Sequence, residues 1–347
     1  MSSNPLEIID ISNITPTTSN SILKSLQTQG FLFLDGHDFT QAEVDHLFCI
    51  SKQFFSLATQ HKQQYAIDSE DRGYATFRQE NLDPDVNKVG DPKEAFNFGG
   101  FNFTTGDASN KSLPSIFTES ENKIALQTIS KKLYALSIKV LKAIAIALEI
   151  SPEDGGSDWF GVRHAPEKTS MSTFRLLHYP SVSSMDSNQE IRAGAHTDYG
   201  SLTLLFQQKG QEGLQLFEPN ASKDTDGKGT WSKVPFVESP NADYRSSGKA
   251  APIVMNIADQ LSFWTNGLLR STLHRVVMPV GDVDRYSVVF FFDANNETEL
   301  VPIPSKLVKE SEGKGKGIEA ITGDDGKPLT TKEYMLRRFK ATYSKGH

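Results

Sequence analysis

Apolar residues recur every three or four positions over residues 122–150, which is the spacing of one face of an α-helix. A shorter helical run ends at Gly30. Thr40 and Glu43 have the spacing of a capping box, in which the two side chains satisfy the first backbone N–H groups of a helix. The pattern therefore predicts helices over residues 17–29, from residue 40 onward, over 122–150 and over 331–343.

From residue 172 onward the pattern changes to short runs rich in β-branched and aromatic residues, separated by turn signals. Many short strands of this kind are typical of a sandwich or barrel. Residues 60–118 are polar and rich in Gly, Asn and Asp, and we expect them to form loops over the mouth of an active site. Strands are predicted at 6–11, 31–34, 174–179, 201–206, 214–217, 253–257 and 286–292.

Composition narrows the class of protein. Of the 347 residues, 37% are apolar and 10% aromatic, so the chain can bury a large core. The formal net charge of −7 disfavours a nucleic-acid partner, which would require a basic face. A negative net charge is still compatible with a small anionic ligand that individual arginines bind.

Cysteine use and the lack of long apolar runs bear on location. The single cysteine, Cys49, excludes an internal disulfide and favours a reducing compartment. The first residues show no basic segment followed by an apolar one, and no run of about 18 apolar residues occurs. We therefore expect a cytoplasmic protein without a membrane partner. The sequence leaves the oligomeric state open, and a monomer is compatible with it.

Three residues have the pattern of a metal site. His196 and Asp198 lie at the head of a predicted strand, and His274 lies close to a later β-rich run. Side chains two apart in a strand point to the same side, so an imidazole and a carboxylate would face one metal. A second histidine completes the 2-His-1-carboxylate set typical of non-haem Fe(II) oxygenases. Because an isolated His-x-Asp pair is more often a surface feature, the prediction depends on all three residues together with the next motif.

That motif is Arg285-x-Ser287. On a strand the two side chains share a side, so a guanidinium fork and a hydroxyl can bind one carboxylate together. Taken alone, the arginine would be better explained by an acidic neighbour at a strand edge. His178 is a rival metal ligand, but no carboxylate stands two residues after it. We expect His178 to pack near the site rather than to bind the metal.

With these residues assembled, the chain resembles the iron(II)/2-oxoglutarate-dependent dioxygenases of the isopenicillin N synthase-like family, in particular its fungal members. The resemblance runs through nearly the whole chain. Its most specific blocks are RLLHYP at 175–180, GAHTDYGSLTLL at 194–205, HRV at 274–276 and RYS at 285–287. It implies a mostly β fold with flanking helices: a distorted double-stranded β-helix (jelly-roll) core with an N-terminal α/β region.

The resemblance also implies roles and a division of the chain. His196, Asp198 and His274 would bind Fe(II), while Arg285 and Ser287 would hold the distal carboxylate of 2-oxoglutarate with help from Tyr179. O2 would be the other co-reactant. The implied segments are an N-terminal non-haem dioxygenase region (1–118), a connecting helix region (119–169), the jelly-roll core (170–300) and a C-terminal extension with a helix (301–347).

The implied activity is hydroxylation of a small organic molecule with release of succinate and CO2. An Fe(II) oxidase that does not use 2-oxoglutarate stays open, because isopenicillin N synthase lacks this cosubstrate yet shares the Arg-x-Ser pair. A binding protein on a degenerate jelly roll is a third interpretation, weakened because no ligand position has been lost. Ala258 stands where the family usually has glycine, and we expect this to alter local packing only.

Some segments are most similar to the fungal thymine dioxygenase subgroup. There an arginine before the metal strand and a phenylalanine after Arg-x-Ser flank a planar base, and Arg192 and Phe291 match these positions. They are the predicted substrate-binding residues of a thymine-type pyrimidine hydroxylase. The same segments are common to fungal members with other substrates, and this broader interpretation is favoured.

Overall fold

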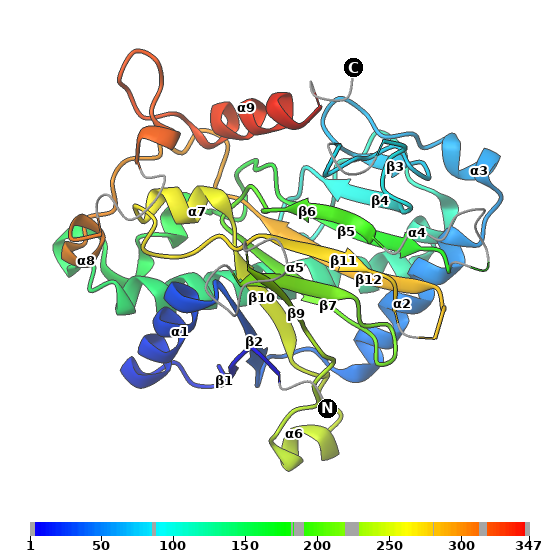
Figure 1. Cartoon of the computed structure of the whole chain (residues 1–347), viewed down its shortest axis with the longest axis horizontal. Helices are drawn as coiled ribbons and strands as arrows, with labels where there is room; N and C mark the ends of the chain where they lie inside the picture. Colours follow the sequence, from blue (N-terminus) through cyan, green and yellow to red (C-terminus); the bar gives the residue numbers. More distant parts are fainter. Residues whose placement is uncertain are drawn as a thin grey trace.

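The computed structural model describes residues 4–84, 88–181, 183, 191–218, 229–279, 281–311 and 318–343. Its core is formed by two β-sheets, with helices on the outside (Figure 1). In spatial order the larger sheet contains β1 (Ile8–Asp10), β2 (Phe31–Asp35), β10 (Ile253–Ile257), β7 (Leu202–Phe206), β12 (Arg285–Phe292), β5 (Thr173–Tyr179), β4 (Glu94–Gly99) and β3 (Gly73–Ala75). The smaller contains β6 (Ile191–His196), β11 (His274–Val277), β8 (Leu214–Glu218) and β9 (Thr230–Lys233).

Antiparallel pairing dominates both sheets, and among the named strand pairs the parallel exception is β1 with β2. β12 lies between β5 and β7, so Arg285 is opposite Tyr179 and Ser287 opposite Leu177. In the smaller sheet His274 is opposite His196. Residues that are 78 or more positions apart in the sequence are thereby brought together by strand register.

Three long helices cover the larger sheet: α1 (Pro16–Thr28), α2 (Gln41–Phe55) and α5 (Ser120–Ala147), which runs behind the strands in Figure 1. Their apolar faces join the main core cluster. The capping box predicted at Thr40 and Glu43 is confirmed, since each side chain accepts from the other residue's backbone N–H at 3.2 and 2.8 Å. No helix in the described part of the chain is long and apolar enough to cross a bilayer.

The remaining helices are short, apart from α9 near the C-terminal end. The helix α7 (Asp259–Trp264) is hydrogen-bonded to residues 198–200, and all six of its residues are buried. The others connect strands or cover the edges of the core. They are α3 (Thr59–Gln63), α4 (Ser115–Thr118), η1 (Pro152–Asp154), η2 (Gly156–Asp158), η3 (Gly161–Arg163), α6 (Ala242–Ser246), α7 (Asp259–Trp264), α8 (Lys306–Lys309), η5 (Ile318–Ile321) and α9 (Thr331–Tyr343).

The predicted helices and strands are confirmed within a few residues, but the prediction of loops over residues 60–118 is wrong in part. β3 and β4 lie in this stretch and extend the larger sheet. Phe96 and Phe98 alternate with Asn97 as in a strand, but this run is short and lies in a stretch rich in Gly, Asn and Asp, so the sequence alone does not mark it. The polar residues of β4 are buried as well. Asn97, for example, accepts a hydrogen bond from Arg175 inside the sheet. The division of the chain into four segments stays a prediction.

Candidate functional site

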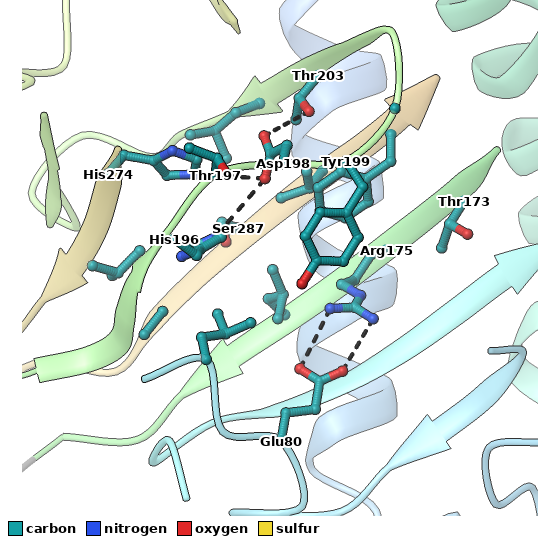
Figure 2. Close-up of a pocket in the computed structure, with 18 of the residues that line it drawn as sticks. Glu80, Thr173, Arg175, His196, Thr197, Asp198, Tyr199, Thr203, His274 and Ser287 are labelled. Atoms are coloured by element: carbon teal, nitrogen blue, oxygen red, sulfur yellow. Dashed lines mark hydrogen bonds and ion pairs between the residues drawn. The ribbon is translucent and has the colours of Figure 1, made fainter. Parts of the chain in front are cut away.

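A cavity of about 160 Å³ lies between the two sheets. Most of its strand residues come from β5, β6, β11 and β12, and β2, β7, β8, β10, the helix α9 and several loops complete the lining. It contains two groups of polar side chains (Figure 2). His196, Asp198 and His274 form one group, which we call the triad. Asp71, Glu80, Lys93 and Arg175 form the other, which we call the charged wall. Figure 2 shows Arg175 and Glu80 facing each other, apart from the triad.

The triad places three metal-binding atoms close together. One ligand atom from each residue lies within 4.8 Å of the others. Oδ1 of Asp198 is 3.6 Å from Nε2 of His274 and 3.8 Å from Nε2 of His196. Two imidazole nitrogens and one carboxylate oxygen at this spacing fit a single metal ion with open positions. Among the described residues, this is the one group of histidines and acids that meets this spacing.

Both imidazoles are oriented by backbone carbonyls. Nδ1 of His196 is 2.7 Å from the carbonyl oxygen of Gly194, and Nδ1 of His274 is 3.0 Å from that of Thr272. A carbonyl accepts only, so each ring must donate from Nδ1. This fixes the tautomer whose Nε2 lone pair is available to a metal.

The carboxylate of Asp198 is oriented by two neighbouring strands. Its Oδ2 accepts hydrogen bonds from Oγ1 of Thr203 on β7 and Nδ2 of Asn256 on β10, both at 2.7 Å. Oδ1 is left to face the two histidines. Sequence reasoning missed these two positioning residues. Thr203 lies in a block that carries the family resemblance and Asn256 lies two residues before Ala258, but neither has a spacing that signals a role.

The expectation that His196 and Asp198 share one side of a strand is wrong. His196 is the last residue of β6, and Asp198 lies in the following loop. The first N–H groups of α7, from Asp259 to Leu261, donate to the carbonyls of residues 198–200 at 2.9–3.4 Å. Gly200 is required there because a Cβ would lie 1.8 Å from Oδ1 of Asp293. Docking on a helix N-terminus, rather than strand alternation, therefore holds the carboxylate.

The local environment favours the protonation states that bind metals. Removal from water, together with the neighbouring His274, lowers the pKa of His196 to about 3. Burial raises the pKa of Asp198, but the two histidines and the bonds from Asn256 and Thr203 outweigh it and the pKa is lowered. At neutral pH the site therefore holds a neutral imidazole and an ionised carboxylate, as metal ligation requires.

Arg285 is a buried cation, 1% exposed, that makes no ion pair within the part of the chain that the structure describes. Its Nη1 donates to Oγ of Ser287 at 3.1 Å and its Nε to the carbonyl of Gln211 at 3.0 Å. Its Cζ is 4.9 Å from the ring centre of Tyr179. All three predicted 2-oxoglutarate residues thus line one part of the cavity. A buried unpaired cation favours an anionic ligand.

The two predicted substrate-binding residues have different positions. Phe291 lines the cavity, but Arg192 does not; its neighbour on β6, Ala193, does. The pairing of β6 with β11 shifts register between Ala193 and His196, so both residues line the cavity although they are three positions apart. Arg192 lies outside the cavity, where its Nε and Nη2 contact the sulfur of Met278 at 3.1 and 2.8 Å. His178 lies outside the triad as expected, between Glu94 and Asp284.

Sequence reasoning gave no role to the charged wall. Arg175 stands out only as part of the strand block that ends at Tyr179, and Glu80 lies in the stretch predicted as loops. Burial raises the pKa of Glu80, but Arg175 and Lys93 outweigh it and lower the pKa to about 2. Glu80 is therefore ionised at neutral pH. No spacing in the sequence connects these residues, because Asp71 precedes β3, Glu80 and Lys93 lie between β3 and β4, and Arg175 lies in β5.

Two family models match the chain: the 2OG-Fe(II) oxygenase superfamily at residues 170–294 and the N-terminal region of non-haem dioxygenases in morphine synthesis at residues 6–115. A UPF0676 protein of Schizosaccharomyces pombe is 32% identical, over 99% of this chain and 94% of its own. A 2-oxoglutarate-dependent dioxygenase of Didymella fabae is 30% identical, over 94% and 90%.

Solved structures of a full-length Neurospora crassa protein, bound to α-ketoglutarate, are similar over almost the whole chain. The complex with α-ketoglutarate alone has a TM-score of 0.72 and 26% identity, covering 97% of this chain and 96% of that one. The complex that also contains thymine has a TM-score of 0.72 and 25% identity, covering 97% of each. The predicted double-stranded β-helix core is thereby confirmed. On the family models and the near full-length relatives, the chain belongs to the 2OG-Fe(II) oxygenase superfamily and is an iron- and 2-oxoglutarate-dependent dioxygenase.

Proposed function

We propose that His196, Asp198 and His274 bind the iron of this dioxygenase, and that Arg285 and Ser287 bind the distal carboxylate of 2-oxoglutarate beside Tyr179. The observation that carries the proposal is the convergence of the three ligand atoms within 4.8 Å. In addition, Nδ1 of each ring and Oδ2 of the carboxylate are already hydrogen-bonded. The atoms left over are the two nitrogens and one oxygen that the iron requires.

When bound, iron with 2-oxoglutarate and O2 supplies oxidation of a substrate C–H bond, coupled to conversion of 2-oxoglutarate to succinate and CO2. One oxygen atom enters the product as a hydroxyl and the other enters succinate. The protein holds the open metal face, orients the cosubstrate through Arg285 and excludes water from the reaction. Tyr199 and Phe291 line the space left for the substrate.

The experiment that tests this assignment measures two signals. Anaerobic mixing of the protein with Fe(II) and 2-oxoglutarate should produce a visible metal-to-ligand absorption band, and admission of O2 should release succinate. The band must be absent when either component is omitted. Product formed without succinate would instead support the 2-oxoglutarate-independent oxidase. If neither the absorption band nor succinate appeared, the assigned iron site would be rejected.

A second candidate function is hydroxylation of a thymine-type pyrimidine. The similar Neurospora crassa protein has been solved with thymine and with 5-formyluracil. Here Phe291 and Tyr199 line the cavity and offer aromatic faces to a planar ring. Arg192 does not support this candidate, because it does not line the cavity. Thymine-dependent stimulation of succinate release would favour it, and release unchanged by thymine would exclude thymine as substrate.

The broader setting of the enzyme is also proposed. The net charge of −7 supports a small-molecule substrate rather than a nucleic-acid partner, and the single cysteine supports a cytoplasmic location. The sequence leaves the oligomeric state open, and a monomer is compatible with it. Size-exclusion chromatography with light scattering would test the oligomeric state directly.

A further inference from the structure

We propose that Glu80 determines the substrate class: by pairing with Arg175 inside the cavity wall, it removes the cation that a substrate carboxylate would need, so the cavity takes an uncharged polar molecule. This inference rests on the proposed function of the cavity as the oxygenase active site. It makes Glu80 a specificity-determining residue.

Arg175 is surrounded by acceptors on three sides. Glu80 contacts it in a bidentate manner, with Oε1 3.1 Å from Nη2 and Oε2 3.4 Å from Nη1 (Figure 2). Oδ2 of Asp71 is 3.4 Å from Nη2, and Nε donates to Oδ1 of Asn97 at 2.7 Å. The Arg175 side chain is 13% exposed and that of Glu80 is 9% exposed. A guanidinium held in this way has its charge balanced before any ligand arrives.

Lys93 does not supply an unpaired cation in place of Arg175. Its Nζ is 3.2 Å from Oε2 of Glu80 and 3.6 Å from Oδ2 of Asp91, and its side chain is 4% exposed. Glu80 therefore bridges both cations of the charged wall. Counted with Asp91, the network has two cations and three carboxylates: Lys93 and Arg175 against Asp71, Glu80 and Asp91.

A substrate carboxylate placed against this wall would meet the oxygens of Glu80 rather than a cation in need of a partner. Like charges repel strongly in a cavity that is poorly screened by water, so an acid should bind at least about tenfold more weakly than its amide. An uncharged amide or hydroxyl avoids this repulsion. At the other end of the cavity the buried and unpaired Arg285 offers the opposite environment, which suits the cosubstrate.

Chemical rescue tests the proposal without knowledge of the natural substrate. Glu80→Ala removes the carboxylate from the cavity wall, and acetate can enter the cavity and replace it beside Arg175. In anaerobic protein loaded with Fe(II) and 2-oxoglutarate, acetate should raise the melting temperature of this variant by several degrees over equal chloride. Wild type should show no such difference. Loading the protein keeps acetate from acting at Arg285.

Glu94→Ala is the matched control. Glu94 is also buried and paired with a lysine, Lys62, at 2.7 Å, but it does not line the cavity. Acetate should not rescue this variant. Stabilisation of both variants alike, or of neither, overturns the proposal.

A second variant, Glu80→Gln, tests the preference for uncharged ligands directly. It also provides the whole test if Glu80→Ala does not fold. Nicotinamide and nicotinate, and orotamide and orotate, are the amide and acid probes, measured by calorimetry on the loaded protein. In each pair the acid-to-amide affinity ratio should rise at least about tenfold from wild type to the variant. A wild type that binds acids as tightly as amides, or a variant that binds no acid, overturns the proposal. If the absorption band of the loaded protein is absent, the proposed function fails instead.

Discussion

Arg285 and Arg175 line the same cavity from neighbouring strands, β12 and β5, but their surroundings are opposite. Arg285 is 1% exposed and makes no ion pair with any described residue, while Arg175 contacts the carboxylates of Glu80 and Asp71. A buried charge is costly unless it is paired. The partner of Arg175 is built into the chain, whereas Arg285 has none among the described residues, which supports the proposal that the carboxylate of 2-oxoglutarate binds it.

The same difference appears between the triad and the charged wall. In the triad, hydrogen bonds to Nδ1 of each imidazole and to Oδ2 of Asp198 leave three ligand atoms available. In the charged wall, hydrogen bonds and ion pairs join carboxylates to Arg175 and Lys93 and so balance their charges. The first arrangement prepares a site for a metal and an anion, and the second prepares a surface for a neutral molecule. The predictions below test this division of the cavity, from the largest expected effect to the smallest.

Asp198→Ala should have the largest effect. Loss of the single carboxylate of the triad should reduce succinate release by at least about 1,000-fold, equivalent to about 4 kcal/mol of activation free energy. The far-ultraviolet circular dichroism spectrum should be unchanged. Asp284→Ala is the control, because Asp284 is 43% exposed and pairs with His178 outside the triad. Succinate release at the wild-type rate would reject the triad as the iron site.

The triad could be predicted from the sequence because its members have local signals, a His-x-Asp pair and a histidine in a later β-rich run, and because Arg-x-Ser on the next strand of the chain supports them. The way in which Asp198 is held could not be predicted from the sequence. Asp198 is held by the N-terminus of α7 and by Thr203 and Asn256, and contacts across three segments leave no periodic pattern.

The charged wall could not be predicted for a related reason. The sequence does not mark β4 as a strand, because its apolar positions are few and the polar Glu94 and Asn97 are buried by partners on other segments. Arg192 shows the converse case. The resemblance implies a substrate contact at this position, but the register shift in β6 between Ala193 and His196 leaves Arg192 against Met278 and outside the cavity. One residue of register separates a cavity residue from one outside.

The stability of two arginine variants tests the comparison directly. Arg175→Met should lower the free energy of unfolding by about 2–4 kcal/mol, because it leaves Glu80 and Asp71 without their cation in a mostly buried wall. Arg285→Met should be neutral or stabilising when 2-oxoglutarate is absent, because it removes an unpaired buried charge. Urea denaturation of the apo proteins measures both. Equal losses in the two variants would contradict the proposed difference.

Binding of the cosubstrate gives a smaller effect. Arg285→Ala should raise the 2-oxoglutarate concentration needed for half-maximal succinate release by about 10–100-fold, the value of one or two hydrogen bonds to a charged group. Ser287→Ala should give a smaller increase, because a neutral hydroxyl contributes a weaker bond. Titration of the anaerobic absorption band gives the same ranking without turnover. An unchanged requirement in the arginine variant would remove its assigned role.

The smallest effect concerns Asp71. Burial raises its pKa to about 6, with Arg175 opposing this and the charge of Glu80 adding to it. The folded protein therefore keeps this proton to a higher pH than the unfolded chain, whose pKa is near 3.8. The resulting stability is fully present below pH 3.8 and is lost as the pH rises through about 6. Glu80 titrates in the opposite sense, and its contribution is lost only as the pH falls from 4.5 toward 2.

Asp71→Asn separates the two titrations, because an amide does not ionise. Relative to this variant, wild type should lose about 1–2 kcal/mol of unfolding free energy between pH 4 and pH 7. This value is smaller than the free energy equivalent to the whole pKa shift of Asp71, because its side chain is 22% exposed and partly screened by water. Urea denaturation of both proteins across this range measures the difference. If wild type instead gains stability over the variant, Asp71 is ionised throughout as a second partner of Arg175, and the charged wall is more strongly anionic than its pairing with Glu80 alone requires. A difference that does not vary with pH would mean that Asp71 titrates alike in the folded and unfolded protein, so that Glu80 carries the electrostatic role of the wall.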